Sequence, residues 1–508
     1  MDIAQAKQQV KHTVEAYLAK DAMGLYRIPP AEQRPVFLLG APGIGKTAIM
    51  AQVAEELGIG LVSYSMTHHT RQSALGLPFI VHREYRTGDS FDVSEYTMSE
   101  IIASVYDYME QSGLDAGILF LDEINCVSET LYPSMLQFLQ FKTFGRHKVP
   151  DGWIVVCAGN PPEYNRSVHE FDIVTLDRLR KIDVQPSFEA WRSYARDRAI
   201  HPAITTYLQV RPDDFYLVES TPEGKSFVSA RSWSELSTLV ALYEQLDLPV
   251  DESVIAQYLQ HREIAERFAS YYELFKKYRS DYQVEAIMAG DVPAEILERA
   301  RNAQFDERLA LLSLLLDSLG SRMRAVREQQ TSLETVRDVL REAKPLLQGG
   351  ASLDDAIGPH VRQLEETVRQ QAESTTCSQE SRRTTLEALA QLKALSASAV
   401  LEKAEAGPDA LSVIEPAYRA LVSGLESEAA GASTALDNAF TFISDAFGED
   451  REMLVFVTEL TARHDTSQFI ARFGSDSYHE HSTALSTATN RDAIYEEIDS
   501  LLDSQVGD

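Results

Sequence analysis

Cysteine is scarce in this sequence, with three residues among 508, and the three stand far apart. An odd number of distant cysteines excludes a disulfide-stapled scaffold and suits a reducing compartment. Long apolar runs are also missing, because the longest strongly apolar stretch, residues 309–316, is far shorter than the about 20 residues that cross a bilayer. Residues 1–20 contain no signal-peptide core. These absences predict a soluble, cytoplasmic protein without a membrane partner.

Positive charge is in deficit as well. Lys and Arg number 47 against 77 Asp and Glu, which gives a formal net charge of −30. Such a chain is repelled by phosphate backbones and by anionic membrane surfaces, so nucleic acid is disfavoured as a partner. The hydrophobic share of 44% and the charged share of 24% are ordinary for globular proteins. A chain of this length predicts about three domains.

The first part of the chain alternates short apolar runs with helical stretches, which is typical of α/β folds. We expect buried parallel strands at residues 36–39, 61–64, 118–121 and 153–156. The alternating stretch from Pro78 to Thr97, with Gly88-Asp89 in its middle, predicts a hairpin.

The chain becomes helical nearly throughout from about Phe188 onward. Apolar residues three and four apart between Leu309 and Val326 draw one stripe along a long helix. Residues 374–431 are rich in Ala, Ser, Glu and Gln. They predict either a long bundle or coiled coil, or a partly mobile arm.

A phosphate-binding motif stands at residues 40–47, which read GAPGIGKT and match G-x-x-x-x-G-K-[ST] at every fixed position. The motif follows a predicted strand and precedes a predicted helix, as it requires. Its glycines let backbone N–H groups face phosphates, Lys46 supplies a cation to the β and γ phosphates, and the Thr47 hydroxyl can bind Mg²⁺. The predicted nucleotide-binding residues are Gly40, Pro42, Gly43, Ile44, Gly45, Lys46, Thr47 and Asp122.

Polar side chains follow two of the later strands. Asp122 and Glu123 come directly after the run 118–121, where Asp122 can hold Mg²⁺ and Glu123 can polarise an attacking water. An acidic pair that merely caps a strand is the alternative, and the upstream phosphate motif argues against it. Asn160 follows the run 153–156 and can orient the water, although Gly-Asn-Pro alone is only a turn signal.

A basic cluster in this acidic chain extends from Thr175 to Lys181. The planar, permanently charged guanidinium of arginine suits a γ-phosphate, and such a group can come from a neighbouring subunit. A solvated helix face is the alternative interpretation of this cluster. Arg231 opens a predicted helix and can reach back to the same phosphates.

In this order the motifs resemble those of an AAA+ ATPase, over about residues 1–280. The closer resemblance is to the MoxR-like branch, through Gly159-Asn160-Pro161-Pro162, Leu176-Asp177-Arg178 and the hairpin-like segment 78–97. That branch often has Pro before its sensor-two arginine, whereas this chain has Ala230.

The resemblance implies a role for each motif residue. Lys46 and Thr47 take the Walker A roles, Thr47 and Asp122 the magnesium role, Glu123 the catalytic base, Asn160 sensor one, Arg178 the trans-acting finger and Arg231 sensor two. Arg180 and Arg166 compete with Arg178 for the finger role, and the sequence leaves that choice open.

The expected architecture is an α/β P-loop core (a parallel sheet with flanking helices) at 1–187, a helical lid at 188–290 and an all-α extension at 291–508. The resemblance implies ATP and Mg²⁺ as cofactors, ATP hydrolysis, a hexameric ring, chaperone-like remodelling of a protein, and a von Willebrand factor A domain partner. A nucleotide-driven nucleic-acid translocase or restriction-type motor is the alternative, which the net charge disfavours. A nucleotide-switched binding module is the third interpretation, which the intact Asp122-Glu123 pair disfavours.

Overall fold

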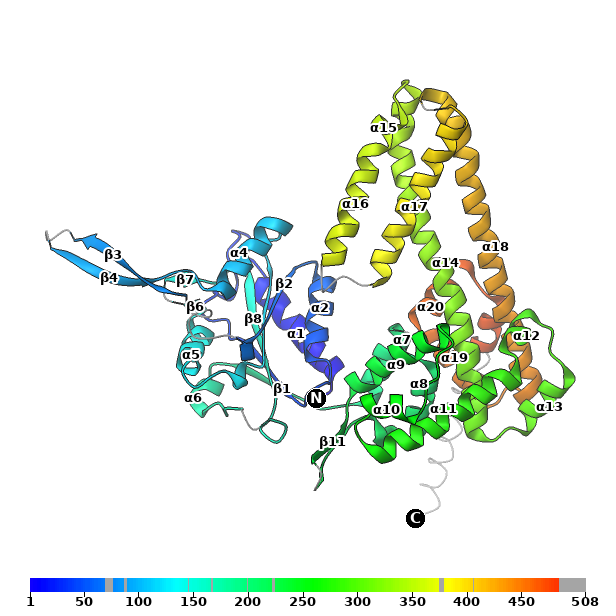
Figure 1. The fold of residues 1–508 in the computed structure, drawn as a ribbon, viewed down its shortest axis with the longest axis horizontal. Coiled ribbons are helices and arrows are strands. Elements are labelled where there is room, and N and C mark those ends of the chain that lie inside the picture. Colours follow the sequence, from blue (N-terminus) through cyan, green and yellow to red (C-terminus); the bar gives the residue numbers. More distant parts are fainter. Residues whose placement is uncertain are drawn as a thin grey trace, which may run out of the picture. The chain divides into compact units, whose positions relative to one another are not determined.

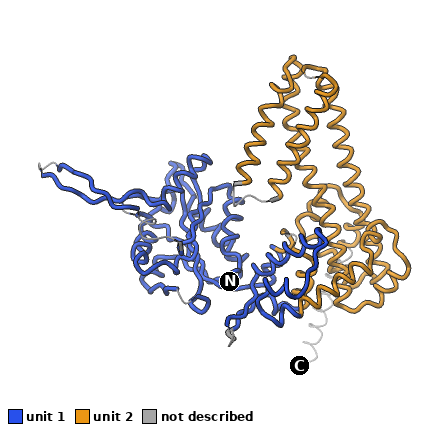
Figure 2. The backbone as a smooth tube through the Cα atoms, in the orientation of Figure 1, with its two compact units in different colours: residues 1–194, 211–266 blue, residues 195–210, 267–508 orange. Residues whose placement is uncertain are grey.

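The computed structural model describes residues 1–68, 76–85, 89–144, 146–165, 168–198, 200–221, 224–373, 379–404 and 406–483. The chain forms two compact units (Figure 2). Unit 1 consists of residues 1–194 and 211–266, and unit 2 consists of residues 195–210 and 267–508. The three-part division expected from the sequence stays a prediction. In the part of the chain that the structure describes, no helix combines the length and the apolar character needed to cross a membrane.

Unit 1 is built on a five-stranded sheet in which neighbouring strands pair in parallel (Figure 1). The spatial order is β2-β5-β8-β1-β9, with bounds β1 Val36–Gly40, β2 Gly60–Ser65, β5 Gly117–Asp122, β8 Trp153–Gly159 and β9 Arg180–Val184. The four strands expected from the apolar runs are confirmed. With the helices that flank it, this sheet confirms the predicted α/β P-loop core.

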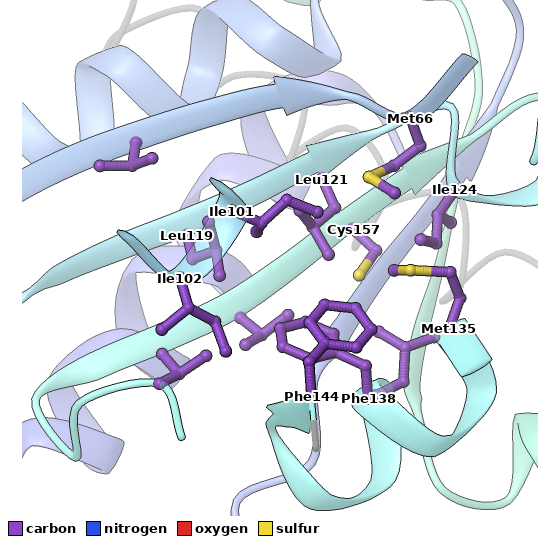
Figure 3. Packing of buried hydrophobic residues seen from close by; sticks show 14 of the residues in the cluster. Met66, Ile101, Ile102, Leu119, Leu121, Ile124, Met135, Phe138, Phe144 and Cys157 are labelled. Carbon is purple, nitrogen blue, oxygen red and sulfur yellow. The ribbon is translucent and has the colours of Figure 1, made fainter. Parts of the chain in front are cut away.

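Successive residues of the central strands enter two separate clusters of buried side chains, one on each face of the sheet. On β5, Leu119 and Leu121 belong to one cluster, while Ile118 and Phe120 belong to the other. Figure 3 shows the first cluster, in which these leucines lie near Cys157 of β8. A strand that is covered on both faces must be apolar at consecutive positions, which explains why these strands read as continuous apolar runs.

Helices supply the other half of each cluster. The helices α1 (Ile3–Leu18) and α2 (Lys46–Leu57) cover one face, and α4 (Glu100–Ser112) and α5 (Tyr132–Phe141) cover the other. Their buried residues recur three and four positions apart, as on any helix that packs on one side. Both α2 and α4 end at a glycine in the left-handed conformation, which only glycine adopts without strain.

The strand β9 corrects one interpretation of the basic cluster. Arg180 and Lys181 open this strand, so the cluster is not a helix face. Only Ile182 and Val184 of β9 are buried. An edge strand that alternates charged and apolar residues lacks the continuous apolar run that marks its neighbours, so the apolar runs of the sequence did not predict it.

The predicted hairpin is present as β3 (Pro78–Glu84) and β4 (Ser90–Tyr96), which pair antiparallel with Val81 opposite Val93. It extends away from the rest of unit 1 (Figure 1), and most of its residues are exposed. Its expected Gly88 turn residue lies outside the described residues. The short elements of unit 1 are η1 Met66–His68, η2 Ile124–Cys126, β6 Thr143–Phe144, β7 His147–Lys148 and α6 Ile173–Leu176.

The second segment of unit 1, residues 211–266, contains an antiparallel ribbon that the expected helical pattern missed. Its elements are η3 Pro212–Phe215, β10 Leu217–Thr221, β11 Gly224–Val228, α9 Ala230–Gln245 and α10 Glu252–Tyr258. Two helices have residues in both units, namely α7 (Phe188–Asp197) and α11 (Arg262–Tyr282). Phe215 packs on Trp191 with a ring-centroid distance of 5.2 Å, and its carbonyl accepts from Trp233 Nε1 at 3.2 Å.

Unit 2 is helical in every described residue that lies in a regular element. Its helices are α8 Pro202–Val210, α12 Val284–Ala289, α13 Ala294–Asn302, α14 Phe305–Gln348, α15 Leu353–Ala356, α16 Gly358–Glu373, α17 Gln379–Leu401, α18 Gly407–Phe447, α19 Arg451–Ala462 and α20 His464–Phe473. The predicted stripe lies on α14, and α14, α16, α17 and α18 run side by side around a common core (Figure 1). Of the alternatives left open for 374–431, a bundle or coiled coil or a partly mobile arm, this packing agrees with the bundle, and residues 374–378 and 405 lie outside the described part.

Candidate functional site

The candidate nucleotide site lies where three neighbouring strands end. The loop 41–45 follows β1, Asp122 ends β5, and Asn160 follows β8, and these strands are adjacent in the order β5-β8-β1. The carboxyl ends of parallel strands meet at one edge of a sheet, which is the usual location of a ligand site in such folds. Residues that lie far apart in the sequence are brought together there.

The last residue of β1 and two positions in the loop after it need glycine, for two different reasons. Gly43 and Gly45 have φ angles of 72° and 97°, a left-handed region that other residues rarely adopt. Gly40 is close to β9, because a Cβ on it would lie 2.5 Å from the carbonyl oxygen of Val184. The loop leads directly into α2, which begins at Lys46. A helix amino terminus reached through such a loop presents free N–H groups and a positive dipole end to an anion.

The ammonium of Lys46 is buried beneath this loop and is held by three oxygens. Its Nζ donates to the carbonyls of Gly40 at 2.7 Å and Ala41 at 2.8 Å, and to Oδ1 of Asn160 at 2.9 Å. Burial lowers its pKa to about 8, the Asp122 carboxylate opposes this shift, and the Arg231 guanidinium adds to it. All three hydrogen-bond acceptors are neutral, so the lysine charge is available to an anionic ligand.

A hydroxyl and a carboxylate that suit Mg²⁺ lie together beside the lysine. Thr47 Oγ1 donates to Asp122 Oδ2 at 2.7 Å. Mg²⁺ prefers hard oxygen ligands, keeps several waters and takes only one or two protein groups when it binds with phosphates. The donor set therefore fits a magnesium ion, with Thr47 and Asp122 as the residues that would hold it.

Glu123 follows in an unusual backbone conformation, with a φ angle of 55°. Its N–H donates to Oδ1 of Asp122 at 2.9 Å, and its Oε2 accepts from Ser65 Oγ at 3.3 Å. A non-glycine residue in the left-handed region is uncommon, and here it lies at the junction between β5 and η2. Ser65, at the end of β2, was not found from the sequence.

Asn125 is a second residue that the sequence reasoning missed. Its Nδ2 donates to the carbonyl of Asn160 at 2.9 Å, and a Cβ on Gly159 would lie 2.5 Å from its Oδ1. It is buried, with 3% of its surface exposed. It therefore fixes the end of β8 and, with it, the position of Asn160. The only sequence signal was its place two residues after Glu123.

Segment 211–266 contributes the Arg231 end of the site. Arg231 is the second residue of α9, which is capped by the Ser229 side chain, and its N–H donates to the carbonyl of Gly43 at 3.1 Å. The predicted helix start is confirmed. The structure thus brings together Lys46, Thr47, Asp122, Glu123, Asn160 and Arg231, with Gly40, Pro42, Gly43, Ile44 and Gly45 forming the loop between them.

Residues 35–179 match the family model for the AAA domain (dynein-related subfamily). The chain contains an AAA domain. No curated protein matches the sequence. AAA domains typically bind ATP with Mg²⁺, so this domain implies ATPase activity for the chain. The matched residues include the loop 40–47, the Asp122-Glu123 pair and Asn160.

Arg178 lies at the opposite edge of the AAA domain's sheet. In the parallel pairing of β9 with β1, Val184 lies opposite Gly40, next to the loop 41–45, and Arg180 lies opposite Val36, at the far end. Arg178 comes just before that far end. The distance along β9 from Arg180 to Val184 is about 13 Å, at 3.3 Å per residue. The structure therefore does not bring Arg178 to the site of its own chain.

The three arginines considered for the finger role have different surroundings. Arg178 is exposed, and its side chain has no hydrogen-bonded partner among the described residues. Arg180 is exposed as well, but its Nη2 donates to Gln9 Oε1 on α1 at 2.9 Å. Arg166 lies outside the described residues.

Proposed function

We propose that this protein is a MoxR-like AAA+ ATPase that hydrolyses ATP with Mg²⁺ in a ring oligomer and thereby remodels or activates a protein partner. The observation that carries the proposal is the meeting of a buried lysine, a hydroxyl–carboxylate pair and a second carboxylate at one edge of the sheet. The AAA domain supports the ATPase part of the proposal.

Each residue has a distinct part in the proposed hydrolysis. The N–H groups of the loop and the Lys46 ammonium hold the β and γ phosphates. Thr47 and Asp122 would hold Mg²⁺, which would neutralise charge on those phosphates. Glu123 accepts a proton from the attacking water as its oxygen bonds to the γ phosphorus and the bond to the β–γ bridging oxygen breaks. ADP and phosphate leave, and Glu123 returns its proton to solvent. Asn160 orients the water.

The ring part of the proposal is supported by the edge that carries Arg178. A guanidinium that is remote from its own site can complete the site of a neighbouring copy. Two apolar residues of α6, next to Arg178, are exposed: Ile173 to 85% and Val174 to 57%. Apolar residues at such a position favour a covered interface in an assembly. A hexamer remains the expected stoichiometry from the resemblance.

The protein-partner part is supported by charge and by the hairpin. The net charge of −30 disfavours nucleic acid. The β3–β4 hairpin, the segment that supports the MoxR-like assignment, exposes large apolar side chains, with Ile80 76% and Phe91 58% exposed. The partner of the proposed complex has a von Willebrand factor A domain, and the reducing cytoplasm suggested by the cysteine content is the proposed compartment.

Two measurements test the proposal. ATP turnover is measured with and without DNA, and protein remodelling requires that DNA leave the rate unchanged. Stimulation by DNA with a steep salt dependence would instead support the nucleic-acid motor. A Glu123→Gln variant loaded with ATP is then used to capture partners. Co-purification of a von Willebrand factor A domain protein that depends on ATP is the expected result.

A further inference from the structure

Two consecutive carbonyls of the phosphate loop are held by donors from segment 211–266. The Tyr216 hydroxyl donates to the carbonyl of Pro42 at 3.1 Å, and the Arg231 N–H donates to the carbonyl of Gly43 at 3.1 Å. The approach is close, because a Cβ on Gly43 would lie 2.8 Å from Ser229 Oγ. The Tyr216 bond has no part in the hydrolysis described above.

The direction of a carbonyl fixes the direction of the following N–H. In a planar trans peptide the C=O and N–H groups point opposite ways. A bond from Tyr216 to the Pro42 carbonyl therefore turns the Gly43 N–H away from Tyr216, to the face of the loop that is free for a phosphate. The next bond does the same for the Ile44 N–H. The Ala41–Pro42 peptide has no N–H, because residue 42 is proline. No N–H donor of this peptide is therefore left facing away from the phosphate.

Tyr216 is itself held firmly. Its ring packs against the buried cluster under the loop, which includes Ala41 and Ile44. The preceding residue, Phe215, is 4% exposed and contacts Trp191 and Trp233. Burial raises the pKa of the Tyr216 phenol, so the hydroxyl stays protonated and remains a donor over the physiological range.

We propose that Tyr216 is a positioning residue for the phosphates of the bound nucleotide. Its hydroxyl fixes the Pro42–Gly43 peptide so that the Gly43 N–H faces the phosphate-binding side of the loop. This inference rests on the proposed nucleotide-binding function. It makes the affinity for phosphates depend on the placement of segment 211–266, through a residue that lies outside every motif of the sequence.

Tyr216→Phe removes only the hydroxyl and keeps the packed ring. We expect this variant in the full chain to bind ATP about five-fold more weakly, which corresponds to about 1 kcal/mol for one hydrogen bond. The KM for ATP should rise by the same factor, and kcat should stay within about two-fold of wild type. The reason is that a less ordered loop weakens binding of the phosphates equally in the ground state and in the transition state. The matched control is Tyr243→Phe, a lid tyrosine on α9 whose side chain has no hydrogen-bonded partner in the described ranges.

Hydrogen exchange at the amides of residues 43–45, with each protein saturated by a non-hydrolysable ATP analogue, provides a second measurement, because these N–H groups are protected when phosphate oxygens accept from them. The Tyr216→Phe variant should exchange faster there than wild type and than Tyr243→Phe. Unchanged nucleotide affinity overturns the proposal, whatever the exchange result. Weaker affinity with unchanged exchange also overturns it, since the hydroxyl would then act elsewhere than on the loop.

The failure of the proposed function can be told apart from the failure of this inference. Wild-type protein that binds no nucleotide would defeat the proposed function. Wild-type protein that binds nucleotide, with Tyr216→Phe binding it equally tightly, would leave the proposed function standing and overturn this inference alone.

Discussion

Lys46 and Asn160 are joined across the site, because the lysine Nζ donates to the asparagine Oδ1 at 2.9 Å. The other two acceptors of the ammonium are backbone carbonyls of the loop. Asn160 is thus the side chain that holds the lysine toward the end of β8. The residue predicted to bind phosphate and the residue predicted to orient water are therefore positioned by each other, and a change in one displaces the other.

Replacing Lys46 tests the nucleotide site most directly. Lys46→Ala removes the buried cation, and we expect ATP binding to become undetectable, because neutral loop donors alone do not balance the phosphate charge. Equilibrium binding of a fluorescent ATP analogue measures this loss. Lys11→Ala is the control, since Lys11 Nζ lies at the surface of α1, 2.6 Å from Glu56 Oε2. Unchanged affinity in Lys46→Ala would refute the assignment of the loop.

Glu123→Gln separates binding from hydrolysis. The amide keeps the size of the side chain and can still bond Ser65 Oγ, but it cannot take a proton from water. We expect ATP to bind normally while kcat falls by roughly 10² to 10⁴. Steady-state turnover and equilibrium binding are measured on the same preparation, with the exposed Glu129→Gln as control. Normal turnover in Glu123→Gln would remove this residue as the base.

Much of the sheet could be predicted because its central strands are buried on both faces and read as continuous apolar runs. The strand β9 could not, because only Ile182 and Val184 of its five residues face the core. The interleaving of the units was also invisible in the sequence. Residues 195–210 belong with 267–508, and this follows from packing partners far along the chain, which no local pattern records.

The site shows the same division between local and long-range information. The loop 40–47 and Asp122 were found because phosphate and Mg²⁺ require certain residue types at fixed spacing. Tyr216 and Asn125 were missed, since each acts through one hydrogen bond to a backbone carbonyl that only the fold brings near. A tyrosine or asparagine that donates one hydrogen bond to a carbonyl requires no particular residues around it, so no sequence motif marks its position.

Arg178 is tested by mixing two inactive proteins. Arg178→Ala alone should lose about 10³ in kcat if its guanidinium completes a neighbour's site. When it is mixed with Glu123→Gln protein, sites with an intact Glu123 gain an intact Arg178 from the neighbour, and turnover should return. Arg180→Ala is the matched control, because Arg180 already bonds Gln9. The trans-acting role is lost if no mixing ratio restores turnover, and the assignment moves to Arg180 if only Arg180→Ala is inactive.

Lys142 predicts a pH dependence of stability that is independent of the nucleotide site. Its Nζ is buried and donates to Gln33 Oε1 at 3.2 Å, and burial lowers its pKa from 10.5 to about 8. Between these two values the unfolded chain holds a proton that the folded chain has lost, so stability rises with pH across that window.

Lys142→Met should remove this contribution. The thermal stability of wild type relative to the variant should increase from pH ~7.5 to pH ~10, by up to about 2 kcal/mol. Thermal unfolding at both pH values measures it, and Lys20→Met, at an exposed position, should track wild type. Lys46 has a similarly lowered pKa but is present in all three proteins, so its contribution cancels. Parallel stability curves for wild type and Lys142→Met would contradict the prediction.

In unit 2, Glu459 stabilises two guanidinium groups at once, which predicts an unequal response to mutation. Arg196 Nε and Nη2 donate to its two oxygens at 2.9 and 2.6 Å, and Arg463 Nε lies 4.0 Å from Oε2. Glu459 is 5% exposed, and burial lowers the pKa of Arg463. Removing the carboxylate charge therefore leaves two confined cations near each other, with Asp317 as the remaining carboxylate that attracts Arg463.

Glu459→Gln should accordingly destabilise unit 2 by about 3–5 kcal/mol, the usual cost of breaking a buried pair. Arg196→Met should cost less, because Glu459 keeps the charge of Arg463 nearby and the methionine fills the space of the arginine stem. Chemical denaturation followed by the helical signal measures both, with the exposed Arg337→Met as a neutral control. An Arg196→Met protein that is as unstable as Glu459→Gln would contradict the prediction, because it would show that the Arg463 contact contributes nothing to stability.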